Sequence, residues 1–133
     1  MFRKSNILAA VSGAALSLAL GVVQAQAQSV AGGTATGNNS VAVGTGSVAS
    51  GDNTTATGQN ATASGLNSTA TGQNSSATGD YSIAEGKDSS ASAAYTTAIG
   101  LSSTASGDSG IAIGAYSEAS GWFSTAVGVR STA

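Results

Sequence analysis

Residues 37–72 read GNNSVAVGTGSVASGDNTTATGQNATASGLNSTATG and repeat one seven-residue phrase, approximately G-x-N-S-x-A-x. Glycine returns at every seventh position from Gly37 to Gly128, with Ala93 as the one replacement. Alanine keeps the same step two residues ahead of each of these positions, beginning at Ala35. A fixed period sustained over this length indicates a repeat architecture, in which each unit buries its surface only against its neighbours.

Each seven-residue unit combines a short strand with a turn. The S-x-A-x part alternates small and variable residues, as in 40–43, and such alternation favours a strand. The Gly-x-Asn part is turn chemistry, because glycine takes positive φ freely and asparagine tolerates the left-handed region. A glycine in every second helical turn, at a cost of about 1 kcal/mol each relative to alanine, excludes long helices. The Ser, Ala and Gly of a unit share one small face. We therefore expect an all-β flat roll of short parallel strands with that face inside.

The variable positions show a second period, twice as long as the first, which predicts about 14 residues per turn of the roll. One set of strands carries mostly β-branched and often apolar side chains: Val41/Val43, Thr55/Thr57, Thr69/Thr71, Ile83/Glu85, Thr97/Ile99, Ile111/Ile113 and Thr125/Val127. The alternating set is nearly all polar: Val48/Ser50, Thr62/Ser64, Ser76/Thr78, Ser90/Ser92, Thr104/Ser106 and Glu118/Ser120. One sheet should therefore face water while the other presents an apolar surface.

An apolar sheet face on a thin roll favours self-association. Burying each Val or Ile there is worth roughly 1.5–3 kcal/mol. Cyclic association, with the same sheet turned inward in every copy, would cover the face economically. The alternative is a monomer whose threonine-rich face stays in water. The threonine pairs at 55/57 and 69/71 favour that alternative locally, because those two turns offer no aliphatic side chain.

Residues 1–27 have the pattern of a secretory signal peptide. Arg3 and Lys4 precede an apolar run over 7–23, and the small-x-small triplet 25–27 predicts cleavage before Gln28. An uncleaved membrane anchor is the alternative, because the run approaches the length that spans a bilayer. We expect residues 28–39 to be a partly disordered Gly/Thr/Asn-rich lead-in and 40–133 to form the roll. The protein is then secreted.

Composition excludes several classes of function. The 133 residues contain no Cys and no His, so disulfides and Cys/His metal sites are impossible and the commonest acid–base side chain is missing. Two basic and six acidic side chains follow residue 27, a net charge of −4 that argues against a nucleic-acid partner. Asp52, Asp80 and Asp108 recur on every second turn, about 10 Å apart, too far to share one cation. We expect turn residues there, no cofactor, no metal and no enzymatic activity.

One corner of the roll should carry a column of side chains that changes character along the rod. Positions two after alternate glycines read Asn39, Asn53, Asn67, Tyr81, Tyr95, Ser109 and Phe123. An asparagine ladder that gives way to aromatic rings can be simple stacking along a solenoid. It can also be a recognition stripe, since exposed aromatic residues are frequent interface anchors. Tyr81, Tyr95, Trp122 and Phe123 are the candidate contact residues, with Trp122 beside Phe123 the best single one.

Several phrases of the repeat resemble a known family. Residues 40–44 (SVAVG), 96–100 (TTAIG), 110–114 (GIAIG) and 124–128 (STAVG) are similar to the S-x-A-[IV]-G motif of trimeric autotransporter adhesin heads, the YadA-like head repeat. The phrase TASG, at 62–65 and 104–107, matches the other half of that repeat. The resemblance covers 40–133. It implies a left-handed parallel β-roll that trimerises through the strands bearing Ile and Val, with this interface: Val41, Val43, Ile83, Ile99, Ile111, Ile113 and Val127.

The resemblance implies a surface adhesin that binds extracellular-matrix protein or glycan through many weak contacts multiplied by trimeric valency. Family members continue into a stalk and a membrane anchor, which are absent from these residues. We therefore expect either a head secreted alone or part of a longer chain anchored at the outer membrane. Ice or crystal binding is the alternative function, because Thr55/Thr57 and Thr69/Thr71 form two regular T-x-T rungs.

Overall fold

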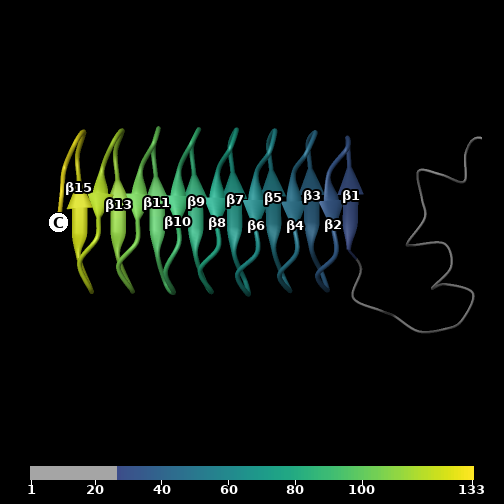
Figure 1. Cartoon of the computed structure of the whole chain (residues 1–133), viewed down its shortest axis with the longest axis horizontal. Helices are drawn as coiled ribbons and strands as arrows, with labels where there is room; N and C mark the ends of the chain where they lie inside the picture. The colour runs from purple at the N-terminus through teal and green to yellow at the C-terminus, as the bar shows by residue number, and fades with distance from the viewer. Residues whose placement is uncertain (1–26) are drawn as a thin grey trace, which may run out of the picture.

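The computed structural model describes residues 27–133, and the predicted signal peptide or anchor lies almost wholly outside this part of the chain. Every regular element described is a strand (Figure 1). No helix among these residues is long and apolar enough to span a bilayer. The strands are β1 (Gln28–Val30), β2 (Thr34–Ala35), β3 (Val41–Val43), β4 (Val48–Ala49), β5 (Thr55–Thr57), β6 (Thr62–Ala63), β7 (Thr69–Thr71), β8 (Ser76–Ala77), β9 (Ile83–Glu85), β10 (Ser90–Ala91), β11 (Thr97–Ile99), β12 (Thr104–Ala105), β13 (Ile111–Ile113), β14 (Glu118–Ala119) and β15 (Thr125–Val127).

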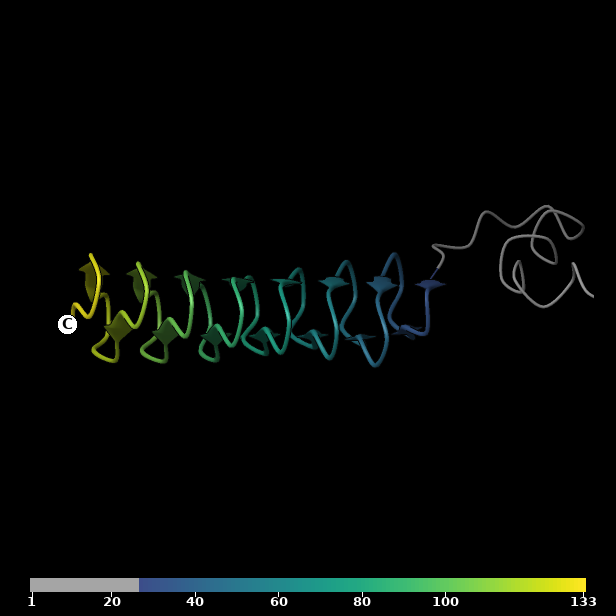
Figure 2. The ribbon, with the colours of Figure 1, turned by 90° about the horizontal axis from the view of Figure 1, so that it is seen from above.

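The strands alternate between two parallel sheets that form the two layers of a straight solenoid (Figures 1 and 2). Odd-numbered strands make an eight-stranded sheet in the order β1-β3-β5-β7-β9-β11-β13-β15, and even-numbered strands make a seven-stranded sheet. From β2 onward each residue pairs with the residue fourteen positions later, as in Ala42 with Ala56. The predicted all-β roll with fourteen residues per turn is therefore confirmed.

Alanine and serine fill the space between the two sheets, as the pattern predicts. The central alanine of every turn from Ala42 to Ala119 is fully buried, and so is the Ser or Thr two residues before it in most turns. A side chain larger than threonine occurs nowhere among the fully buried residues of the described chain. The two backbones thus lie close together, and every larger apolar side chain must point out of the roll.

The roll begins earlier than expected, at Gln28. The expected disordered lead-in contains β1 and β2, which extend both sheets by one strand. Gln28 pairs with Val41, thirteen residues later, whereas all later turns take fourteen. The missing residue lies in the connection from Val30 to Thr34, where Ala31 and Gly32 adopt φ of 51° and 81° to make a tighter corner. This single deletion hides the first turn from a search for a fixed period.

Each corner places one residue in the left-handed region, at seven-residue intervals. The asparagines at these corners adopt φ of 54–56°, for example Asn53 and Asn60. Glycines that follow the odd-numbered strands have a second requirement. Gly58 lies at φ 129°, and a Cβ there would sit 2.5 Å from the carbonyl oxygen of Gly72 in the next turn. This glycine is therefore required both by its backbone angle and by the close approach of the adjacent turn.

A buried hydroxyl closes most corners. The Ser or Thr before each strand donates a hydrogen bond to the carbonyl oxygen three residues earlier, as in Ser82 to Gly79 at 2.6 Å and Thr54 to Gly51 at 2.7 Å. Ser68 and Ser124 are exceptions, since their buried hydroxyls lack a partner within the described residues. At corners such as that of Gly79, the serine hydroxyl satisfies a carbonyl oxygen that an alanine would leave without a hydrogen bond.

Replacing Gly58 by alanine should destabilise the roll by about 2–4 kcal/mol, because the new methyl meets backbone rather than a movable side chain. Gly46→Asn is the matched control. Gly46 occupies the left-handed position held by asparagine in the next turns, and the nearest atom to its Cβ is the mobile end of Asn60. We expect its free energy of unfolding to stay within about 1 kcal/mol of the parent. Guanidinium unfolding followed by circular dichroism measures both, and equal losses would contradict the stated reason.

The hydroxyls give a second pair of variants. Ser82→Ala removes a 2.6 Å hydrogen bond and should lower the free energy of unfolding by about 1 kcal/mol. Ser68→Ala removes a buried hydroxyl without a partner and should be neutral or stabilising. The same denaturation experiment compares them, and a larger loss for Ser68→Ala would show that its hydroxyl is satisfied in solution.

Candidate functional site

The outer face of the eight-stranded sheet gathers all the residues expected at an interface. Their common feature is an outward position on an odd-numbered strand: Val41, Val43, Ile83, Ile99, Ile111, Ile113 and Val127. Ile99, Ile113 and Val127 follow one another in register across β11, β13 and β15. None of the seven is fully buried, and Ile113 is 38% exposed. The structure thus places these side chains together on one surface of the single copy.

Two further features of this face were not anticipated. Val30 pairs with Val43 and adds a half-exposed valine to the same column. The sequence pattern did not predict this valine, because the first turn has thirteen residues and does not fit the period of fourteen. Glu85 is the one charged side chain on this face in the described chain. It lies between Thr71 and Ile99, at the end of β9, in the same column as Ile113 and Val127.

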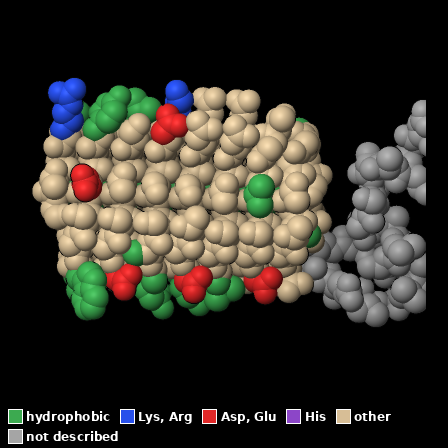
Figure 3. All heavy atoms as spheres, viewed as in Figure 1, with side chains coloured by type: hydrophobic (Ala, Val, Ile, Leu, Met, Phe, Trp, Pro, Cys, Tyr) green, Lys and Arg blue, Asp and Glu red, His purple; other side chains and the backbone are tan. Residues whose placement is uncertain are grey.

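The outer face of the seven-stranded sheet is small and polar. Its first outward positions run Thr34, Val48, Thr62, Ser76, Ser90, Thr104 and Glu118. The central area of the face in Figure 3 accordingly carries one hydrophobic and one acidic side chain among small polar ones. This surface suits contact with water and offers no continuous apolar area.

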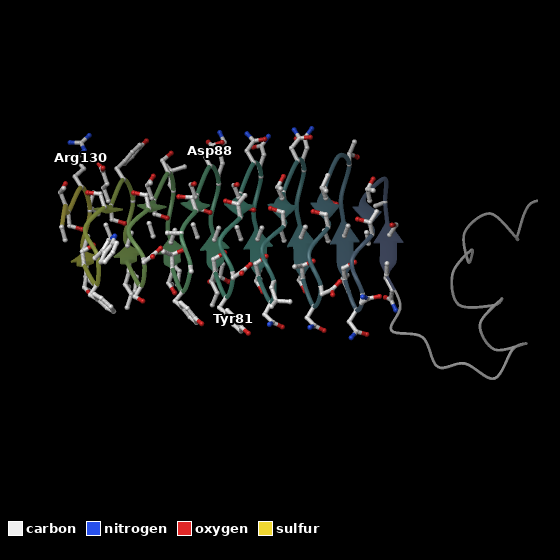
Figure 4. The ribbon with its side chains drawn as sticks, turned by 60° about the horizontal axis from the view of Figure 1, so that its bottom comes forward. Tyr81, Asp88 and Arg130 are labelled. Carbon is white, nitrogen blue, oxygen red and sulfur yellow. The ribbon has the colours of Figure 1, made fainter. Side chains whose placement is uncertain are left out.

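The corners stack into two rims along the rod. We call the rim where the chain enters the eight-stranded sheet the entry rim; its two-residue tips are 38–39, 52–53, 66–67, 80–81, 94–95, 108–109 and 122–123. The exit rim, where the chain leaves that sheet, has tips 45–46, 59–60, 73–74, 87–88, 101–102, 115–116 and 129–130. Figure 4 shows Tyr81 on the entry rim and both Asp88 and Arg130 on the opposite exit rim.

The predicted column of the entry rim exists. Asn39 donates from Nδ2 to Oδ1 of Asn53 at 3.1 Å, which is the first step of the expected asparagine ladder. Further along, the rings of Tyr81 and Tyr95 stack with centroids 5.1 Å apart and planes 5° from parallel. Trp122 and Phe123 end the rim at 79% and 78% exposure. Stacking along the rod is therefore established for the tyrosine pair, while about half of the surface of Tyr81 and more of the other three aromatic residues is available to a partner.

Acidic residues of the entry rim join successive turns. Asp52 Oδ1 accepts a hydrogen bond from the backbone N–H of Asn38 at 2.9 Å, and Asp80 Oδ1 accepts one from Leu66 at 2.8 Å. The prediction of a turn role is confirmed for these two aspartates. No group of three potential metal ligands occurs among residues 27–133.

The exit rim was not singled out from the sequence, although it follows the same rule from the other glycines. Its first half is an amide ladder, with Gln73 donating to Gln59 at 3.0 Å and Asn74 donating to Asp88 at 2.9 Å. Lys87 lies 3.7 Å from Asp88 in an exposed ion pair. The second half exposes Leu101, Tyr116 and Val129. Both rims therefore change from amide to apolar side chains along the rod.

Comparison with protein families agrees with this geometry. The family model described as the YadA head domain repeat (2 copies) matches residues 35–61, 63–89 and 91–117. This chain belongs to the YadA head repeat family. Each match begins two turns of the roll after the previous one, in step with the pairing of the strands. No curated protein matches the chain significantly.

The YadA head family defines a class of function. Its members are non-enzymatic heads of trimeric autotransporter adhesins. They form trimers and are displayed on the cell surface. The exposed aliphatic face of this YadA head roll and its two rims are thus the surfaces to consider for assembly and adhesion.

The stacked tyrosines should stabilise the roll beyond their separate contributions. A double-mutant cycle with Tyr81→Leu and Tyr95→Leu should give a coupling energy of about 0.5–1.5 kcal/mol. The same cycle between Tyr95 and Tyr116, which lie on opposite rims, should give none. Equal coupling in both cycles would show that the effect is not due to ring stacking.

Proposed function

We propose that this chain is the head of a trimeric adhesin, which attaches its bearer to matrix-protein or glycan surfaces through three copies of the roll. The observation that carries the proposal is the aliphatic outer face of the eight-stranded sheet in a chain of the YadA head family. In the trimer the three copies of this face point at the common axis. Val41, Val43, Ile83, Ile99, Ile111, Ile113 and Val127 form the interface.

The width of the sheet favours three copies over four. Each side of the roll spans about five extended residues, or roughly 17 Å. Three such sides close an equilateral triangle whose centre is about 5 Å from each sheet, half the usual ~10 Å spacing of packed sheets. Valine, threonine and isoleucine fill that distance. Four sides would leave a centre roughly 8 Å from each sheet, which is more than half that spacing and beyond the reach of these side chains. Two copies of this sheet would instead pack face to face as a two-layer sandwich.

Target contact is proposed for the aromatic residues of the entry rim, Tyr81, Tyr95, Phe123 and above all Trp122. Large, rigid and exposed rings are efficient anchors for a protein or sugar surface. Each copy offers a weak contact, and a trimer multiplies it through effective concentration. No observation favours ice binding, since the T-x-T rungs of β5 and β7 occupy two turns alone and give way to Ile83 and Glu85 on β9.

The proposal assigns the residues before Gln28 to an export signal that is cleaved off, so that the mature head acts outside the cell. Display at the outer membrane applies when the head belongs to a longer anchored chain.

Assembly and adhesion can be tested together with one matched pair of variants. Ile111→Asp places three carboxylates near the axis without partners, in a column whose other members are uncharged, and should weaken trimer formation by at least about 100-fold. Ser106→Asp puts the same charge on the exposed face of the seven-stranded sheet and should leave the trimer intact. Light scattering gives the mass of each.

Binding to immobilised matrix proteins and a glycan array then measures adhesion. The parent and Ser106→Asp should bind alike, Ile111→Asp should lose avidity, and Trp122→Ala should lose binding while remaining a trimer. A parent chain that is strictly monomeric, or a trimer that binds neither class of surface, would contradict the proposal.

A further inference from the structure

The two rims of one roll match each other in size and polarity at most positions. An entry-rim residue and the exit-rim residue six places later are of the same kind, except where Tyr81 corresponds to Lys87. Asn53 and Asn67 correspond to Gln59 and Gln73, so amides match amides. The exposed residues of both rims also become apolar along the rod, from Leu66 and Tyr81 on the entry rim and from Leu101 on the exit rim.

The apolar half keeps the correspondence residue by residue. Tyr95 corresponds to Leu101 and Phe123 to Val129, and all four are exposed. Between these two large pairs, Ser109 corresponds to Ala115, a small residue with a small one.

No contact within one copy accounts for this agreement. The paired positions lie at opposite ends of the same strand of the eight-stranded sheet, six residues or about 20 Å apart. Hydrogen bonds and stacking within each rim join residues fourteen apart, and none of these joins one rim to the other. The match therefore indicates a contact between rims of different copies.

We infer that the trimer is sealed by three side seams, each made by the entry rim of one copy and the exit rim of the next. This inference rests on the proposed trimer. Rotation about an axis along the rod makes all strands of the inward sheets run in the same sense, so each sheet begins where its neighbour's ends. The rotation also preserves height. Six residues advance the chain by about 2 Å along the rod, so each entry-rim residue lies within about 2 Å of the height of the residue six places later in the neighbour.

Charge is distributed as such a seam requires. Asp52, Asp80 and Asp108 all lie on the entry rim, whereas Lys87 and Arg130, the two basic residues of the described chain, lie on the exit rim. Figure 3 shows acidic side chains along the entry rim and both basic ones along the exit rim, where Asp88 adds one negative charge beside Lys87. The seam thus joins rims of opposite character. Self-pairing of two identical rims would bring like charges together.

At the level where the amides end, the seam joins Tyr81 to the neighbour's Lys87. The ammonium group is held within its own copy by a single exposed ion pair with Asp88 at 3.7 Å, which is weak. It can therefore lie over the ring of the neighbour in a cation–π contact. Asp80 keeps its Oδ1 on the backbone N–H of Leu66, which leaves Oδ2 for the same ammonium group.

The seam divides the aromatic stripe between two tasks. Tyr81, Tyr95 and Phe123 directly precede the inward-facing sheet and so adjoin the neighbour. Trp122 is one residue further from that sheet and, at the outer side of the seam, adjoins the neighbour's Arg130. Target contact then narrows to a surface that two copies build together, a tryptophan from one and an arginine from the next.

Engineered disulfides test the seam directly, because the chain contains no cysteine of its own. The double variant Ser109→Cys, Ala115→Cys carries one thiol on each rim at matching heights. Oxidation should convert most of the chain to a covalent trimer on a non-reducing gel, since three interchain bridges close the ring. The control, Ser109→Cys, Gln73→Cys, separates the thiols by more than two turns and should give only background cross-linking, because a disulfide needs Cα atoms within about 7 Å.

The outcomes separate the seam from the trimer. Light scattering on the reduced double variant reports assembly independently. A reduced trimer whose matched cysteines fail to cross-link would overturn the seam and leave the trimer standing, as would equal cross-linking of the control. A monomeric chain would overturn both. Asn67→Cys, Gln73→Cys repeats the test in the amide half, so that misfolding of the first variant cannot decide the result.

Discussion

The close approach of two backbones across a layer of alanine and serine governs the whole structure. With alanine fully buried in nearly every turn, the interior has no room for a larger side chain. So thin a core buries little apolar area per residue. Cohesion comes instead from backbone ladders between turns, including the corner bonds such as that from the N–H of Asn67 to the carbonyl of Asp52 at 2.9 Å. Glycine spacing, serine hydroxyls and left-handed corners all serve that approach.

The same constraint decides where binding energy must lie. Isoleucine, tyrosine and tryptophan cannot enter the roll, so each one in the described chain is displayed on its surface or rims. In an ordinary domain these side chains would form the core. Here they are reserved for contact between copies and with a target, which explains why a chain with so few large apolar residues concentrates them on one face and two edges.

Periodicity made most of the fold predictable. The seven-residue period distinguishes strand positions from turn positions. The fourteen-residue period separates the two outer faces, so it correctly assigns Val43, Ile99 and Ile113 to one sheet. Prediction failed where the period itself failed, at the thirteen-residue turn that places Val30 beside Val43. The exit rim was missed for another reason. The glycines at alternate seven-residue steps define two series, one for each rim. The second series leads to Tyr116 and Arg130 by the same two-residue offset that gives the entry-rim column.

A roll of this kind can change length only in whole turns. An insertion of seven residues would move every later aliphatic side chain to the other sheet and exchange the two rims, whereas an insertion of fourteen preserves face, rim and register. The same holds between copies, because a whole turn inserted in each keeps equal heights opposite one another. Side-chain chemistry can drift along the rod from amide to aromatic, provided that both rims drift together. That coupled drift is what residues such as Asn67 with Gln73 and Phe123 with Val129 record, and a free monomer would have no reason to keep it.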